Sequence, residues 1–272
     1  EESHTQEYMK DYSASEIPLK LEGGELAYNF DWYYGPTDVK VLAKYEKLGL
    51  EDSIPFGWGI FGWINRYFFT PVFTFLSSML PAGIAIIVMT ILVRLAMSPV
   101  TYKSYLSQAK MKVLKPEIAE INEKYKDNAM KRQQETMKLN NKAGVSPLSG
   151  CIPALIQMPI FYALFSFFPT SFALRQKSFL WADDLSSYDT IAQLPFTIPF
   201  YGDHVSLFPI LASIAIFFYM MMTTGQNMTQ QPGMPNMKFI MYLSPVMMLV
   251  FFNGYASGLS LYYFISNLIT IF

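Results

Sequence analysis

Residues 81–102 read PAGIAIIVMTILVRLAMSPVTY, an apolar run in which Arg94 is the one charged side chain. A helix needs about 20 mostly apolar residues to cross the ~30 Å hydrocarbon core of a bilayer (range ~17–25). Three further runs fall in this range without any charged residue: 148–168, 207–224 and 239–255. A fifth apolar run, 258–272, is shorter and ends where the chain ends. We interpret it as a fifth span whose inner end is missing.

The composition of the whole chain also favours a membrane protein. Of its 272 residues, 52% are hydrophobic and 15% are charged, whereas soluble domains carry about 25% charged residues. A soluble enzyme or binding module is therefore not expected. The net charge of -1 argues against a disordered or nucleic-acid-binding chain. The single cysteine, Cys151, cannot form an internal disulfide or a thiolate metal site by itself.

Charge is segregated along the chain, and this segregation predicts the orientation of the spans. Residues 1–55 hold five Lys against twelve Asp and Glu, whereas 103–142 hold ten Lys and Arg against five acids. Basic short loops face the cytoplasm, so the 103–147 hairpin is expected inside. Alternation of the spans then places the 225–238 loop inside as well, where Lys238 is its one basic residue. Residues 1–55 and the 169–206 loop are expected on the outer side of the membrane.

Residues 56–80 are ambiguous between a sixth span and a helix lying on the membrane. One stripe at spacings of three and four is apolar: Phe61, Ile64, Phe68, Val72, Phe75 and Met79. A second stripe is mostly polar: Gly59, Trp63, Arg66, Thr70, Thr74 and Ser77. Two such stripes are typical of an amphipathic interfacial helix, and we favour that interpretation. If 56–80 crossed the bilayer instead, residues 1–55 would be cytoplasmic.

Residues 17–34 are expected to end an external β domain. Leu26, Tyr28, Phe30 and Trp32 alternate with Ala, Asn and Asp after a Gly23-Gly24 turn. Two short strands cannot fold alone, so an upstream part of that domain is expected to be missing.

Segment 103–142 is predicted to form a helical hairpin. Leu114, Ile118, Ile121 and Tyr125 follow helical spacing, a turn is expected at 126–128, and residues 129–142 form a second, more polar helix. Pro116 must kink the first helix or start a new one. The hairpin is either a solvated linker or a cytoplasmic docking arm, and we favour the latter. Its basic candidates are Lys115, Lys124, Lys126, Lys131 and Arg132.

Arg94 is the strongest candidate for a functional residue. A charge near the bilayer centre costs about 2.5–3.5 kcal/mol on insertion scales and usually faces protein or water. None of the five spans contains Asp, Glu or His, so no ion pair within the membrane can neutralise Arg94. Neutral polar groups or water must do so, and the candidates at a similar depth are Gln157, Ser98 and Asn267. The alternative for Arg94 is snorkelling, and the alternative for Gln157 is a helix–helix hydrogen bond.

The residues absent from the spans exclude several function classes. Proton-coupled transporters need carboxylates or histidines inside the membrane. Intramembrane proteases need paired Asp residues, a zinc-binding motif, or a basic side chain that activates a serine. The five spans contain no Asp, Glu, His or Lys. No glycine-rich phosphate loop is present in the sequence. We therefore expect neither an enzyme nor a cofactor or metal site. A polar groove that is open to the cytoplasm fits better.

The sequence resembles the YidC/Oxa family of membrane-protein insertases, and most closely its bacterial branch. The similarity runs from about Tyr33 to Phe272. Its most specific part is VSPLSGCIPALIQMPIF at 145–161. Other matching stretches are 34–36 (YGP), 56–58 (FGW), 90–94 (TILVR), 98–99 (SP), 111–116, 181–186 (WADDLS) and 257–267. Gly254 and Ala256 stand where many relatives have Trp and Pro.

The resemblance implies an all-α polytopic fold, in which five core helices surround a hydrophilic groove. It implies that newly made membrane proteins enter the bilayer through this groove, alone or with the Sec translocon. Arg94 matches the family's groove arginine, and Thr90 and Tyr263 match client-facing positions. Nascent clients, the ribosome and the lipid bilayer are the other implied partners. A lipid scramblase or a passive channel with the same polar groove remains the alternative.

Overall fold

A computed structural model describes residues 32–126, 128–144, 152–223 and 237–271. The chain divides into two compact units, Glu1–Gly35 and Pro36–Phe272, and the elements below belong to the second. The β domain expected at 17–34 falls almost wholly on residues outside the described ranges, as does most of the 225–238 loop. In chain order the elements are α1 (Val39–Leu42), η2 (Ala43–Leu48), η3 (Leu50–Ser53), α2 (Gly59–Ile64), η4 (Asn65–Phe69), α3 (Thr70–Met79), α4 (Ala82–Val113), α5 (Lys115–Lys124), α6 (Ala129–Lys142), α7 (Ile152–Thr170), η6 (Phe172–Leu174), β1 (Ala192–Ile198), β2 (Gly202–Val205), α8 (Leu207–Thr223), α9 (Met237–Asn253) and α10 (Ser257–Ile271).

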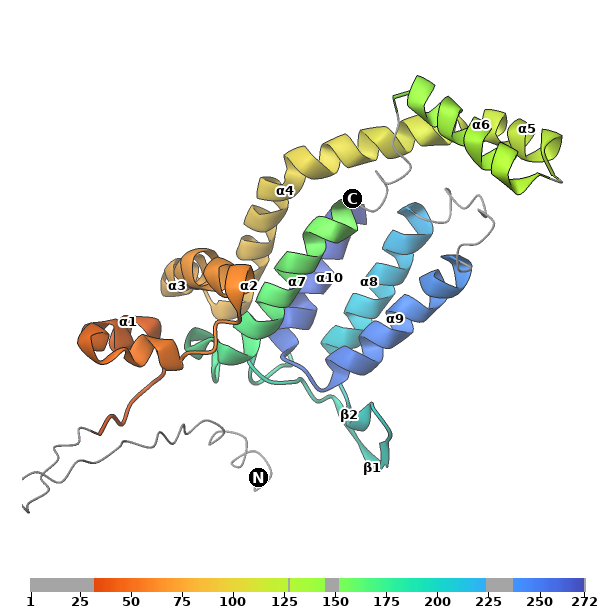
Figure 1. Ribbon diagram of the computed structural model, residues 1–272. Coiled ribbons are helices and arrows are strands. Elements are labelled where there is room, and N and C mark those ends of the chain that lie inside the picture. Colours follow the sequence, from red (N-terminus) through yellow and green to blue (C-terminus); the bar gives the residue numbers. More distant parts are fainter. Residues whose placement is uncertain (1–31, 127, 145–151, 224–236, 272) are drawn as a thin grey trace, which may run out of the picture. The chain divides into compact units, whose positions relative to one another are not determined.

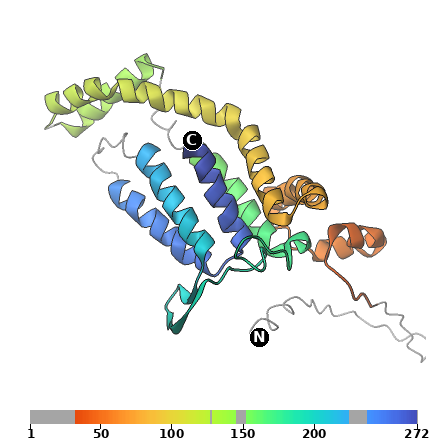
Figure 2. The ribbon, with the colours of Figure 1, turned by 180° about the vertical axis from the view of Figure 1, so that it is seen from behind.

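The expected helical core is confirmed, since each of the five apolar runs forms a helix. Figures 1 and 2 show α7, α8, α9 and α10 side by side, seen from opposite directions. Helix α10 packs against α8, α4 and α7, and α8 packs against α9. The buried residues that hold these helices together are large and apolar, for example Met89, Phe168, Leu259 and Tyr262.

Helix α4 carries Arg94 and is the longest element, with 32 residues. It runs without interruption past the predicted boundary at residue 102, because Pro99 lies inside it without ending it. Within the described residues, α4 alone passes both a length and a hydropathy criterion for a membrane span. The described apolar stretches of α7, α8, α9 and α10 are 10–17 residues long.

The amphipathic segment 56–80 forms one continuous helical stretch from α2 through the π-helical η4 to α3. Its core-facing residues are Asn65, Phe69, Phe73 and Leu76. The apolar stripe predicted from the sequence is divided: Ile64 and Val72 pack against the core, whereas Phe68, Phe75 and Met79 are exposed. The segment therefore has two apolar faces: one packs on the core, and the other is left for surroundings outside the protein.

The hairpin after α4 consists of α5 and α6, which pack against each other. Pro116 starts a new helix rather than kinking the first, since it occupies the opening turn of α5. Helix α6 covers the predicted residues 129–142, and the Asn128 side chain caps it by accepting a hydrogen bond from the Lys131 amide at 3.0 Å.

The segment between α7 and α8, predicted from the sequence as an external loop, contains two strands. Strands β1 and β2 form an antiparallel hairpin. Asn253, at the end of α9, holds it: the Asn253 amide group donates to the carbonyls of Tyr201 and His204 at 2.9 and 2.8 Å. The alternation in 192–198 is weak because Pro195 interrupts it and most of the side chains on both faces are exposed, so periodicity alone could not reveal the strand.

Candidate functional site

Arg94 lies on the face of α4 that meets α10, and its side chain is only partly buried. Its guanidinium donates through Nε to the Ser266 hydroxyl at 2.6 Å. Tyr262 and Tyr263, on the same helix as Ser266, lie near this positive charge. Within the described part of the chain, no carboxylate forms an ion pair with Arg94. A hydroxyl, which is neutral, is thus the direct partner of this charge.

Gln157 and Tyr263 form the second part of the site, contributed by α7 and α10. The two side chains face each other. Yet the Gln157 Nε2 atom and the Tyr263 hydroxyl are buried and make no hydrogen bond of ordinary geometry with any described residue. Phe161 and Phe252 flank Tyr263, with ring centroids at 5.6 and 5.7 Å. These two polar groups therefore keep hydrogen-bonding capacity within an aromatic wall.

The remaining predicted groove residues differ in burial. Thr90 is fully buried and donates to the Ile86 carbonyl of its own helix at 2.7 Å. Asn267 is buried and donates to the Tyr263 carbonyl at 2.7 Å. Ser98 is exposed, and its side chain has no hydrogen bond to Arg94 among the described residues. Tyr263 thus lies close to both Arg94 and Gln157, whereas Ser98 is not part of this cluster.

Sequence reasoning missed Ser266, the residue that Arg94 actually contacts. A signal was available in α10, where Ser260, Tyr263, Ser266, Asn267 and Thr270 recur at spacings of three, three, one and three. At helical spacing these residues share one face. Ser266 is completely buried, so this polar face is directed inward, toward α4, rather than toward lipid.

The hairpin residues gather around one aromatic ring. Lys124 and Lys131 hold their ammonium groups 5.9 and 5.5 Å from the centroid of Tyr125. Lys124, Lys126 and Lys131 are exposed, while Lys115 and Arg132 are partly buried. The turn between α5 and α6 therefore presents a concentrated positive charge.

Comparison with known proteins identifies the family. The family model described as 60Kd inner membrane protein matches residues 73–272. The chain is 49% identical to the membrane protein insertase YidC of Parabacteroides distasonis, over 95% of this chain and 43% of that protein. The chain belongs to the YidC family of inner membrane proteins. The resemblance stated from the sequence is thereby confirmed.

Further members of the YidC family agree with this assignment. The membrane protein insertase YidC of Phocaeicola vulgatus is 48% identical over 97% of this chain and 44% of its own length. Among solved structures, an active YidC insertase with its first transmembrane domain resolved matches with a TM-score of 0.52 and 28% identity. That match covers 85% of this chain and 49% of the solved one. The chain therefore spans less than half the length of these curated relatives.

Proposed function

We propose that the protein inserts newly made membrane proteins into the bilayer, using the polar site around Arg94. The observation that carries this proposal is the surroundings of Arg94: a cation whose guanidinium donates to a serine hydroxyl, beside the buried polar atoms of Gln157 and Tyr263. Membership of the YidC family supports the same activity, because its curated members are named membrane protein insertases.

The proposed mechanism is physical rather than chemical. Moving an unpaired polar group of a client into hydrocarbon costs roughly 2–7 kcal/mol. A client segment that reaches the site can instead hydrogen-bond to Gln157, Tyr263 and the guanidinium of Arg94. Because no described carboxylate neutralises Arg94, its charge remains available to attract an acidic segment. The site would thus shorten the apolar distance that the segment must cross.

The proposed orientation follows the distribution of charge. The basic hairpin of α5 and α6 faces the cytoplasm, and β1 and β2 lie on the periplasmic side. Nascent clients would then approach from the side of the hairpin, where the lysines around Tyr125 offer contacts to a ribosome. Cooperation with the Sec translocon is part of the same proposal.

Site-specific photocrosslinking during translation of a small membrane protein tests the proposal. Crosslinkers at Gln157 and Leu106 should capture the nascent chain, whereas one at Phe196, an exposed residue of β1 on the proposed periplasmic side, serves as the control. Arg94→Glu should reduce crosslinking more for a client with an acidic external segment than for a client with a basic one. We expect the two reductions to differ about tenfold, which corresponds to a difference of about 1.4 kcal/mol in binding free energy. If no crosslink forms while the protein scrambles lipids in vesicles, the insertase proposal fails. Equal loss for both clients would remove the charge-attraction argument.

A further inference from the structure

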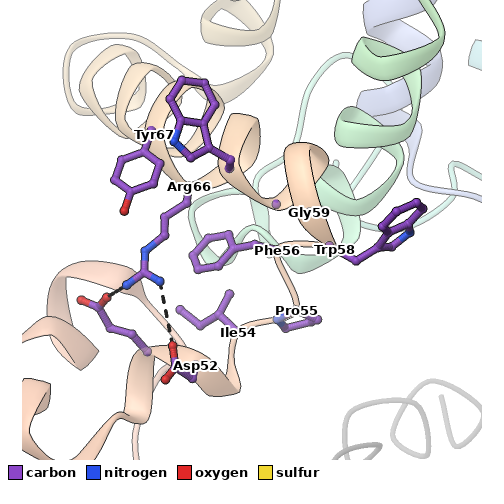
Figure 3. Close-up of a pocket in the computed structure, with 12 residues that line it drawn as sticks. Asp52, Ile54, Pro55, Phe56, Trp58, Gly59, Arg66 and Tyr67 are labelled. Carbon is purple, nitrogen blue, oxygen red and sulfur yellow. Dashed lines mark hydrogen bonds and ion pairs between the residues drawn. The ribbon is translucent and has the colours of Figure 1, made fainter.

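An open hollow lies where η3 and the following residues 54–58 approach the amphipathic segment α2–η4 (Figure 3). Its volume is about 570 Å³. The Asn65 amide, just outside the lining, donates to the Phe56 carbonyl at 2.7 Å and so ties residue 56 to η4. Gly62 packs so closely on the Gly57 carbonyl that an added Cβ would lie 2.2 Å from that oxygen. The hollow is therefore a built feature of the segment, separate from the Arg94 site.

Three charged side chains line the hollow, namely Arg66, Glu51 and Asp52, and two of them can still bind a further partner. Arg66 Nη2 is bound tightly to Glu51. In contrast, Arg66 Nη1 lies 3.9 Å from Asp52 Oδ1, which is the outer limit of an ion pair. The side chain of Asp52 is 83% exposed and that of Arg66 is 37% exposed. A carboxylate and a guanidinium edge thus stand side by side, each open to a further partner, and the three charges sum to -1.

Exposed aromatic rings border the charged pair. Trp63 and Tyr67 lie in tilted contact with ring centroids 5.7 Å apart, and both are more than 60% exposed. On the other side, Arg66 sits over the Phe56 ring at 5.9 Å. Exposed Trp and Tyr on an amphipathic helix are typical of the level of lipid headgroups. This step rests on the proposed interfacial placement of the segment.

We propose that this hollow binds the headgroup of a phospholipid that carries a primary ammonium, such as phosphatidylethanolamine. Its phosphate would accept hydrogen bonds from Arg66, and its ammonium would donate to Asp52, so that the two dipoles align head to tail. A choline headgroup has no N–H to donate to Asp52. An anionic glycerol headgroup would bring no cation to a hollow whose own charge is already negative.

Native mass spectrometry of the whole purified protein tests the assignment, with short-chain phosphatidylethanolamine, phosphatidylcholine and phosphatidylglycerol as probes. We expect preferential retention of the ethanolamine lipid. Asp52→Asn should weaken that retention by about tenfold, because the amide oxygen can still accept a hydrogen bond but no longer carries the charge that pairs with the ammonium. Asp183→Asn, another exposed acid on the proposed periplasmic side, should leave retention unchanged. An unaltered melting temperature of the Asp52→Asn variant would show that the fold is intact.

Four results would overturn the assignment. Equal retention of the three lipids would do so, as would equal retention of the ethanolamine lipid by the Asp52→Asn and Asp183→Asn variants. Glycerophosphoethanolamine binding as tightly as the lipid would indicate a soluble ligand instead. Displacement of the lipid by a lysine-rich peptide at lower concentration than by this compound would indicate a protein segment as the occupant.

The insertion assay separates this inference from the proposed function. Arg94→Glu should impair insertion while the ethanolamine lipid is retained, because the hollow is lined by other residues. If Asp52→Asn has no effect on lipid retention but Arg94→Glu still impairs insertion, the headgroup assignment fails and the insertase proposal stands.

Discussion

Asp189 is predicted to be the polar residue whose loss destabilises the described fold most clearly. It is 1% exposed, and its Oδ2 atom accepts three hydrogen bonds. These come from the Trp181 indole at 2.9 Å, the Leu207 amide at 2.8 Å and the Phe208 amide at 3.1 Å. The last two amides begin α8, so one carboxylate ties the loop to the start of a core helix.

The magnitude follows from those three contacts. Asp189→Ala leaves three donors without an acceptor at a buried site, where each unpaired group costs about 1–3 kcal/mol. Partial access of water to the helix end reduces the sum, so we expect a loss of about 3–5 kcal/mol in the free energy of unfolding. Asp189→Asn keeps one oxygen acceptor but loses the charge at the helix N-terminus, and should lose about 1–2 kcal/mol.

Equilibrium unfolding in mixed detergent micelles measures these differences, and hydrogen exchange of the Leu207 and Phe208 amides localises them. Asp183 is the matched control because it is exposed in the same loop. Asp183→Ala should change stability by less than about 0.5 kcal/mol. If Asp189→Ala is no worse than Asp183→Ala, or if the two amides stay protected from exchange, the role assigned to this carboxylate is refuted.

Two further predictions concern packing and titration. Gly258→Ala should destabilise the protein by about 1–3 kcal/mol, because the new Cβ would lie 2.7 Å from the Phe168 ring and 2.9 Å from the Leu185 carbonyl oxygen. Gly254→Ala is the control, since a Cβ added there has nothing within 4 Å and should not destabilise the protein. Equal unfolding midpoints of the two variants would contradict this prediction. The hydrogen bond from Lys138 at 2.8 Å lowers the pKa of Glu135 below its ordinary value. The stabilisation from this pair is therefore present above the unfolded-state pKa and is lost as the pH falls through the lower folded-state pKa. Carboxyl ¹³C NMR should show the pKa of Glu135 rising in Lys138→Met but not in Lys142→Met, and an unchanged titration in Lys138→Met would refute the pairing.

The sequence predicted the helical elements well because each depends on local information. Long apolar runs specify the core helices, and the turn expected at 126–128 separates α5 from α6, whereas the structure decides that Pro116 starts α5. The YidC family was recognisable from the 145–161 motif. The proposed topology stays a prediction, as do the roles assigned to the groove and hairpin residues.

Partnerships between distant residues could not be predicted in the same way. Ser206 stands at the natural capping position of α8, yet its hydroxyl donates to the Asn253 carbonyl, and Asp189 from the preceding loop supplies the acceptor instead. Likewise, the apolar stripe of segment 56–80 was visible, but the structure packs Phe69 and Phe73 on the core and leaves Phe75 exposed. Which face is buried depends on the shape of the neighbouring helices.

Arg94 shows the division between the two kinds of information most clearly. The sequence by itself determined that a charge lies in an apolar helix and that no span supplies an acid to neutralise it, because composition and spacing are properties of the chain. Only the tertiary structure decided that Ser266 is its partner and that Tyr263 lies near both Arg94 and Gln157. The rotation of α10 about its axis sets these contacts, and that rotation is fixed by packing across the whole bundle.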